Sequence, residues 1–136
     1  MIKKKTGVAL TAVVLALGGC GGDAPQPAPT AADPAAFCAR WKAAQLPFLL
    51  YTAPEAKAWA KAVADSYQGK EPADAVAIQR AYFSAWAQAT RPLAAQASTP
   101  ELRTALTEQV AELDRRAAAG AADYTPPITR ALEVCR

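Results

Sequence analysis

The stretch Ser98–Gly120, STPELRTALTEQVAELDRRAAAG, carries the clearest helical pattern in the chain. Its apolar residues recur at three- and four-residue intervals, a spacing that places their side chains on one face of an α-helix. They are Leu102, Leu106, Val110, Leu113 and Ala117. Ser98 and Glu101 have the spacing of a capping box and Gly120 is a helix stop, so one long amphipathic helix is predicted between them.

Three more helices are predicted ahead of this stretch. Their starts are an N-cap followed by proline at Asp33-Pro34, a capping box formed by Thr52 and Glu55, and the pair Glu71-Pro72. The helical spacing predicts a set of side chains that face the core, most of them aromatic or branched: Phe37, Cys38, Trp41, Ala56, Trp59, Val63, Tyr67, Val76, Ile78, Tyr82, Phe83 and Trp86.

Proline and glycine set the expected ends of these helices. Pro47 and Pro92 should end or kink the first and third helices, because the residue before a proline avoids helical geometry. Gly69 should end the second helix. After Gly120, Thr125-Pro126-Pro127 predicts the start of a short last helix that aligns three residues on its inner face: Ile128, Leu132 and Cys135. The sequence therefore predicts an all-α fold, an antiparallel bundle of four to five helices over residues 34–136.

The N-terminal segment has a different composition. Lys3–Lys5 precede an apolar run of about ten residues, Val8–Leu17, which is typical of an export signal. A helix of that length rises about 15 Å, whereas the hydrocarbon layer of a bilayer is about 30 Å thick. The run is therefore predicted to be a targeting element rather than a membrane span.

The apolar run closes with Leu17-Gly18-Gly19-Cys20, which resembles the lipobox of bacterial lipoproteins. In that family the cysteine becomes the mature N-terminus and its thiol receives a diacylglyceryl group. The resemblance implies a lipoprotein signal peptide at residues 1–19 and lipidation of Cys20, which would hold the protein on the extracytoplasmic face of the cell membrane. An ordinary secretory signal with an incidental cysteine is the alternative. An alanine-rich composition in which arginine outnumbers lysine fits a GC-rich genome and, with the lipobox, suggests an actinobacterial source.

Residues 20–33 read as a lipid-anchored flexible linker. Gly21–Asp33 has no apolar periodicity and contains prolines at alternating positions, Pro25, Pro27 and Pro29. A proline-rich chain extends about 3.1 Å per residue, so this tether reaches about 40 Å at most.

Cys38 and Cys135 are left as an even pair once Cys20 is assigned to lipid. Both are expected to face the core of a domain exported to an oxidising compartment, which predicts a disulfide between them. The chain-entropy treatment assigns a loop of this length about 4–5 kcal/mol of stabilisation. The alternative is a pair of buried free thiols.

The charge balance gives no indication that the protein binds nucleic acid. The chain has 15 Lys+Arg and 12 Asp+Glu, a net charge of +3. Lys3–Lys5 belong to the predicted signal peptide, so the mature side chains balance to zero and no basic run remains. No nucleic-acid partner is predicted.

The absence of histidine removes Ser-His-Asp and Cys-His mechanisms and the commonest metal ligand. No serine lies in a nucleophile motif. Glu108 and Glu112 suit ion pairs on a solvated helix face, with Arg116 one turn beyond Glu112. We therefore predict no catalytic residue, no metal and no cofactor.

The remaining functional candidates are large apolar residues, some of them in the unpatterned stretch Leu46–Tyr51. They are Trp41, Phe48, Leu49, Tyr51, Trp59, Tyr82 and Trp86. Core packing is the default interpretation of these residues, and a binding pocket or partner patch is the alternative. The sequence favours a non-catalytic, membrane-anchored module that binds an envelope protein. The alternatives are a carrier of an apolar ligand, such as a lipid or glycan fragment held in an inter-helix pocket, and an envelope enzyme.

Overall fold

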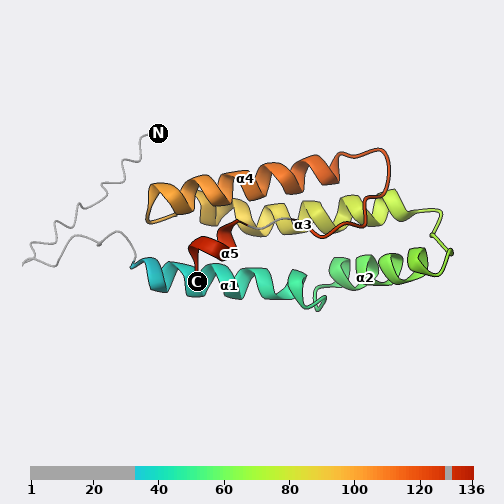
Figure 1. Ribbon diagram of the computed structural model, residues 1–136, viewed down its shortest axis with the longest axis horizontal. Coiled ribbons are helices and arrows are strands. Elements are labelled where there is room, and N and C mark those ends of the chain that lie inside the picture. The colour runs from blue at the N-terminus through green and yellow to red at the C-terminus, as the bar shows by residue number, and fades with distance from the viewer. Residues whose placement is uncertain (1–32, 128–129) are drawn as a thin grey trace, which may run out of the picture.

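The computed structural model describes residues 33–127 and 130–136, and this part of the chain is all-helical. The helices are α1 (Pro34–Leu49), α2 (Pro54–Tyr67), α3 (Ala75–Ala95), α4 (Pro100–Ala117) and α5 (Ala131–Val134). Figure 1 shows α3 in the middle of the bundle, with α4 along one side and with α1 and α2 placed end to end along the other. The predicted bundle of four to five helices is confirmed.

The predicted signal peptide (1–19), the lipidation site Cys20 and linker residues 20–32 lie outside the described residues. Within the described ranges, no helix combines the length and the apolar character needed to cross a bilayer.

Both prolines that were expected to end or break a helix lie inside one. α1 continues past Pro47 to Leu49, and α3 continues past Pro92 to Ala95. Each proline sits within the last turn of its helix and removes only one intrahelical hydrogen bond. The carbonyl that loses its partner is that of Ala43 in α1 and that of Gln88 in α3, and both residues are exposed. Water can satisfy those carbonyls, and the cost stays small enough for tertiary packing to outweigh it.

The start of α2 also differs from the prediction. Ala53 caps the helix without a side-chain hydrogen bond, and the expected capping box of Thr52 and Glu55 does not form. The backbone amides of Thr52 and Ala53 instead donate to the Pro47 carbonyl, at 2.9 and 3.0 Å. The turn that joins α1 to α2 therefore takes up the residue that would have capped α2.

The end of α2 follows the prediction. Gly69 adopts φ +70° and its amide donates to the Ser66 carbonyl at 3.0 Å, while the Lys70 amide donates to the Asp65 carbonyl at 2.9 Å. These two bonds form a Schellman motif, in which a left-handed glycine terminates the helix.

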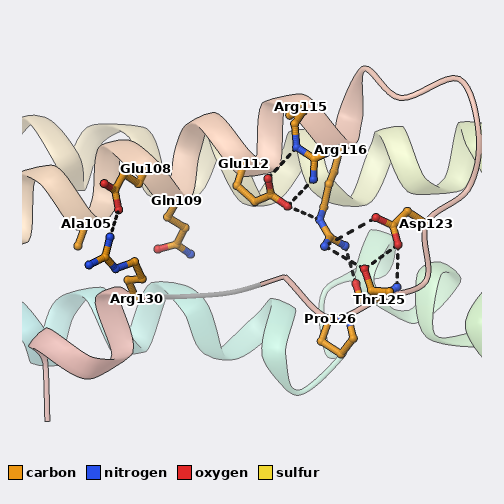
Figure 2. Close-up of a pocket in the computed structure, with 10 residues that line it drawn as sticks. All are labelled: Ala105, Glu108, Gln109, Glu112, Arg115, Arg116, Asp123, Thr125, Pro126 and Arg130. Atoms are coloured by element: carbon orange, nitrogen blue, oxygen red, sulfur yellow. Dashed lines mark hydrogen bonds and ion pairs between the residues drawn. The ribbon is translucent and has the colours of Figure 1, made fainter.

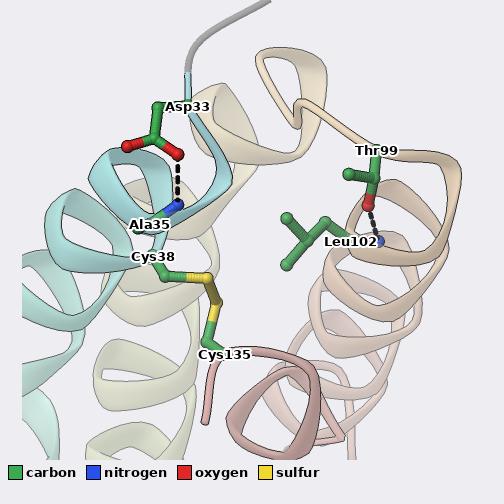
Figure 3. Close-up of a disulfide and its surroundings, with 6 residues drawn as sticks. All are labelled: Asp33, Ala35, Cys38, Thr99, Leu102 and Cys135. Atoms are coloured by element: carbon green, nitrogen blue, oxygen red, sulfur yellow. Dashed lines mark hydrogen bonds between the residues drawn. A yellow bond between two sulfur atoms is a disulfide. The ribbon is translucent and has the colours of Figure 1, made fainter.

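Two later helices start after the predicted positions. α3 begins at Ala75 rather than at Glu71-Pro72. α4 begins at Pro100 with Thr99 as its cap instead of Ser98, and the Thr99 hydroxyl accepts a hydrogen bond from the Leu102 amide at 3.2 Å (Figure 3).

The disulfide between Cys38 and Cys135 is confirmed, with its two Cα atoms 5.4 Å apart. Figure 3 shows that it joins α1 to the residue that follows α5. The last helix is shorter than predicted, and Leu132 is 39% exposed rather than core-facing. Ala131 and Cys135 occupy the inner face instead, whereas Ile128 lies outside the described residues.

The core forms two clusters of buried side chains. One joins the end of α1 to α2, α3 and α4 around aromatic rings: Phe48, Trp59, Tyr82, Phe83 and Trp86. The other joins α1, α4 and α5: Phe37, Trp41, Leu102, Leu106, Ala131 and Cys135.

Tyr67 does not belong to the core, although the spacing of α2 predicted that it would. It is the last residue of α2 and is 81% exposed, whereas Ala62 occupies the inner face at 1% exposure. Small residues such as Ala62 let α2 approach α3 closely, whereas Tyr67, at the C-terminal end of α2, lies outside that contact.

Candidate functional site

An aromatic pocket of about 210 Å³ lies where the end of α1, α2 and the segment after α4 meet. Five of the seven residues singled out from the sequence line it: Leu49, Tyr51, Trp59, Tyr82 and Trp86. The structure adds further aromatic and proline side chains to the wall: Tyr67, Tyr124, Pro126 and Pro127. We call this hollow the aromatic pocket.

The base of the aromatic pocket is a stack of rings held in place by packing and hydrogen bonds. Trp59 stacks on Tyr82 with ring centroids 5.8 Å apart and on Tyr124 at 5.2 Å. The Tyr82 hydroxyl donates to the Phe48 carbonyl at 3.3 Å. Burial, and secondarily the nearby Tyr51, raise the pKa of Tyr82 above its ordinary value, so its hydroxyl remains a neutral donor at physiological pH.

One wall of the aromatic pocket comes from the segment that follows α4. Gln79 fixes this segment, because its amide group donates to the carbonyls of Arg116 (2.9 Å) and Ala121 (3.2 Å) and accepts from the Asp123 amide (2.6 Å). The Tyr124 hydroxyl donates to Glu71 at 2.8 Å. Desolvation and this bond raise the pKa of Tyr124 to about 12. The wall is therefore held from α3 and from the loop before it.

The rim of the aromatic pocket is exposed and apolar. Leu49 is 38% exposed, Tyr51 45% and Tyr67 81%. Tyr51 adopts φ +53°, in the left-handed region. A bulky residue in that region costs about 1–2 kcal/mol of stability. Strained residues of this kind cluster at functional sites, where the function requires a fixed side-chain position.

The other two residues singled out from the sequence do not line the aromatic pocket. Trp41 is buried in the second core cluster, among residues such as Leu106. Phe48 stacks behind the pocket on Trp86, with ring centroids 5.8 Å apart and planes 3° from parallel. The structure thus places the predicted set partly around a pocket and partly in the core.

A second, charged hollow of about 560 Å³ lies between α4 and four later residues, Asp123, Thr125, Pro126 and Arg130 (Figure 2). Glu112 accepts hydrogen bonds from Arg115 and from Arg116, whose Nε is 2.7 Å from Glu112 Oε1. Arg116 also donates to Thr125 and lies 3.8 Å from Asp123. The predicted helical pair of Glu112 and Arg116 is present, and it continues into a network that fastens the loop.

Glu108, the other acidic residue on this face of α4, pairs with an arginine outside the helix. Glu108 pairs across the hollow with Arg130, at 3.3 Å. Arg116, only 5% exposed, also lies over the Phe83 ring with its guanidinium carbon 5.4 Å from the centroid. The charged side chains around the hollow are thus paired with one another, which suits a structural role.

Acid should weaken the fold through Glu112. Hydrogen bonds from Arg115, and then from Arg116, lower the pKa of this carboxyl from 4.5 to about 2. A depressed folded-state pKa contributes stability above pH about 4.5, and that stability is lost as the pH falls from about 4.5 towards 2. Asp123, whose pKa is also lowered, acts in the same direction. Urea denaturation at several pH values should show this loss.

The matched variant for this measurement is Glu112→Gln. It removes the titrating group, so the slope of stability against pH between about 4.5 and 2 should become shallower than in the wild type. An unchanged slope would show that Glu112 is not linked to folding.

A buried polar network was not predicted from the sequence. Gln45 of α1 accepts hydrogen bonds from Trp86 of α3 and from Gln109 of α4, the latter at 2.9 Å, and donates to Thr90 at 3.3 Å. The inward spacing of Gln45 could have pointed to it, because a glutamine on an apolar face needs polar partners. Its place between three helices indicates that it fixes their register.

Among the described residues, no group of three or more His, Cys, Asp or Glu side chains is placed to hold a metal ion. Comparisons of the chain with protein-family models, with curated proteins and with solved structures found no match.

Proposed function

We propose that this protein is a non-catalytic binding module of the cell envelope, anchored to the extracytoplasmic face of the membrane through lipid on Cys20. It binds an apolar or aromatic side chain of a protein partner in the aromatic pocket. The observation that carries the proposal is the combination of a rigid aromatic base with an exposed rim formed by Leu49, Tyr51 and Tyr67.

The composition of this surface is typical of protein recognition. Tyrosine and tryptophan are enriched at the centres of interfaces because they bury a large area for little loss of side-chain entropy. Tyr67 has no packing role in the bundle at 81% exposure, and Tyr51 retains a strained backbone. The backbone of Tyr51 costs stability in an isolated domain, and a bound partner would account for both this strain and the exposure of Tyr67.

The volume of the aromatic pocket favours a partner's side chain over a free ligand. Pockets for small molecules span about 300–1,000 Å³, whereas the aromatic pocket is about 210 Å³. This supports the protein-binding function over the alternative of a carrier for lipid or glycan fragments. The ion pairs that occupy Glu108 and Glu112 likewise favour a non-catalytic role, since neither carboxylate is held apart for acid–base work.

The proposal is tested by site-specific photo-crosslinking in cells of the source organism, using the lipidated full-length protein. A benzophenone amino acid at position 67 should yield a discrete crosslinked protein band. The same amino acid at Gln88, an exposed position on α3, is the matched control and should yield none. Identical bands at both positions would contradict the proposal.

Two rim variants sharpen this experiment. Leu49→Ser and Tyr51→Gly should each abolish the band at position 67. Glycine accepts φ +53° without strain, so Tyr51→Gly should leave the free energy of unfolding unchanged or raise it by about 1 kcal/mol. A band that persists in both variants would exclude the aromatic pocket as the binding site, and a lipid adduct in place of a protein band would support the carrier alternative.

A further inference from the structure

The end-to-end placement of α1 and α2 gives the bundle one long outer face. Both helices pack on α3 from the same side (Figure 1), so the residues opposite their buried stripes face away from the bundle together. All of these residues are exposed: Ala39, Ala43, Leu46 and Leu50 on α1 and its C-cap, and Lys57 and Lys61 on α2. We call these six residues the α1–α2 outer face.

The α1 half of the outer face is apolar. Leu46 is 47% exposed and Leu50 is 63% exposed, although α1 offers four inward positions that are buried. Between the two leucines and the start of the helix the face carries only alanines. When a helix is apolar on its solvent side as well as on its core side, the exposed apolar side indicates contact with a partner or a membrane.

The charges around the outer face are basic. α1 contains no acidic residue, and its charged side chains, Arg40 and Lys42, flank the apolar strip. On α2, Lys61 pairs with Asp65, whereas Lys57, like Lys42, makes no ion pair within the described part of the chain. Exposed leucines bordered by cations suit a membrane interface, where the leucines can enter the acyl boundary and the cations can contact anionic head groups.

We infer that the α1–α2 outer face lies on the surface of a bilayer that contains anionic phospholipid, with Leu46 and Leu50 inserted and the flanking cations on the head groups. Lysine is depleted at protein–protein interfaces and aromatic residues are enriched there. The outer face has lysines and no aromatic side chain, so lipid fits it better than protein does. The linker predicted at residues 20–33 precedes α1, and its expected reach of about 40 Å at most would keep this face within range of the membrane.

This inference goes beyond the proposed function, because it concerns a different surface. Leu49 and Tyr51 open into the aromatic pocket, while Leu46 and Leu50 face away from α3. A bundle lying on its outer face would therefore keep the aromatic pocket open along the membrane plane, where a partner could reach it.

The inference is tested by vesicle co-sedimentation with the chain from position 20 onward, carrying Cys20→Ser so that it has no lipid. Its disulfide is verified by intact mass and its helicity by circular dichroism. The protein should partition onto phosphatidylcholine vesicles containing about 30% phosphatidylglycerol, and added salt should weaken this binding. Protein that remains in the supernatant overturns the inference.

Variants of the outer face locate the contact. Leu46→Ser with Leu50→Ser should lower the partition coefficient about tenfold or more, and Lys57→Gln should lower it about fivefold. The controls, Leu132→Ser on α5 and Arg80→Gln on α3, remove an exposed apolar and an exposed basic side chain from elsewhere and should have no effect. Equal losses in controls and outer-face variants overturn the inference. Because the assay contains no protein partner, its failure leaves the proposed role of the aromatic pocket standing.

Discussion

Replacing both Cys38 and Cys135 with serine should lower the free energy of unfolding by about 2–5 kcal/mol. The bond spans 97 positions of sequence, so its loss returns a large amount of chain entropy to the unfolded state. It is also a main attachment of α5, a helix of four residues in which Ala131 is the buried side chain. The C-terminal segment should therefore detach before the rest of the bundle unfolds.

Two measurements check this expectation. Urea denaturation of the double variant gives the change in free energy, and wild-type protein treated with reductant should lose a similar amount. Hydrogen exchange should show the largest loss of protection in residues 131–135. A double variant within about 0.5 kcal/mol of the wild type would show that the helices alone account for the stability.

Phe83→Ala should have a comparable or larger effect, a loss of about 3–5 kcal/mol. Phe83 has no exposed surface and its ring contacts both Trp59 and Tyr82, with centroids 5.5 and 4.9 Å away. Truncation would leave a cavity at the centre of the aromatic cluster. It would also remove the ring beneath the buried Arg116 guanidinium.

The matched control is Tyr67→Ala, which removes an aromatic ring of similar size from an 81% exposed position. It should change the free energy of unfolding by less than about 0.5 kcal/mol. Chemical denaturation of the two variants side by side makes the comparison. Similar losses in both would mean that Tyr67 packs on the bundle after all.

The sequence predicted those parts of the fold that depend on local periodicity. The three- and four-residue spacing of Leu102, Leu106 and Leu113 identified α4, because a single stripe can face only one core. The pairing of Cys38 with Cys135 was predictable because both were expected on inner faces and the third cysteine, Cys20, was predicted to carry lipid.

Helix ends were less predictable, because they depend on competition between local and tertiary contacts. A proline is expected to stop a helix, but Pro47 and Pro92 each lie so near a helix end that the lost hydrogen bond matters little. Thr52 had the right spacing to cap α2, yet it is used to close the turn after α1. Residue spacing alone predicts neither the continuation of a helix past a proline nor the loss of the Thr52 cap.

The aromatic pocket was predictable only in part. Leu49, Tyr51 and Trp59 were recognisable as large apolar residues near the end of one helix and along the next. The opposite wall was not, because Tyr124 reaches the pocket through hydrogen bonds that Gln79 makes far away in the sequence. Long-range placement of an irregular segment leaves no periodic signal.

The position of the disulfide also has a mechanical consequence. A pull on the chain ahead of Asp33, as a membrane tether would exert, enters the bundle at the first turn of α1. Unwinding can proceed only from Pro34 to Phe37 before it meets Cys38, which is covalently joined to Cys135. From that point the load divides between α1 and the C-terminal segment, so the bundle resists tension as a closed loop rather than peeling apart one helix at a time.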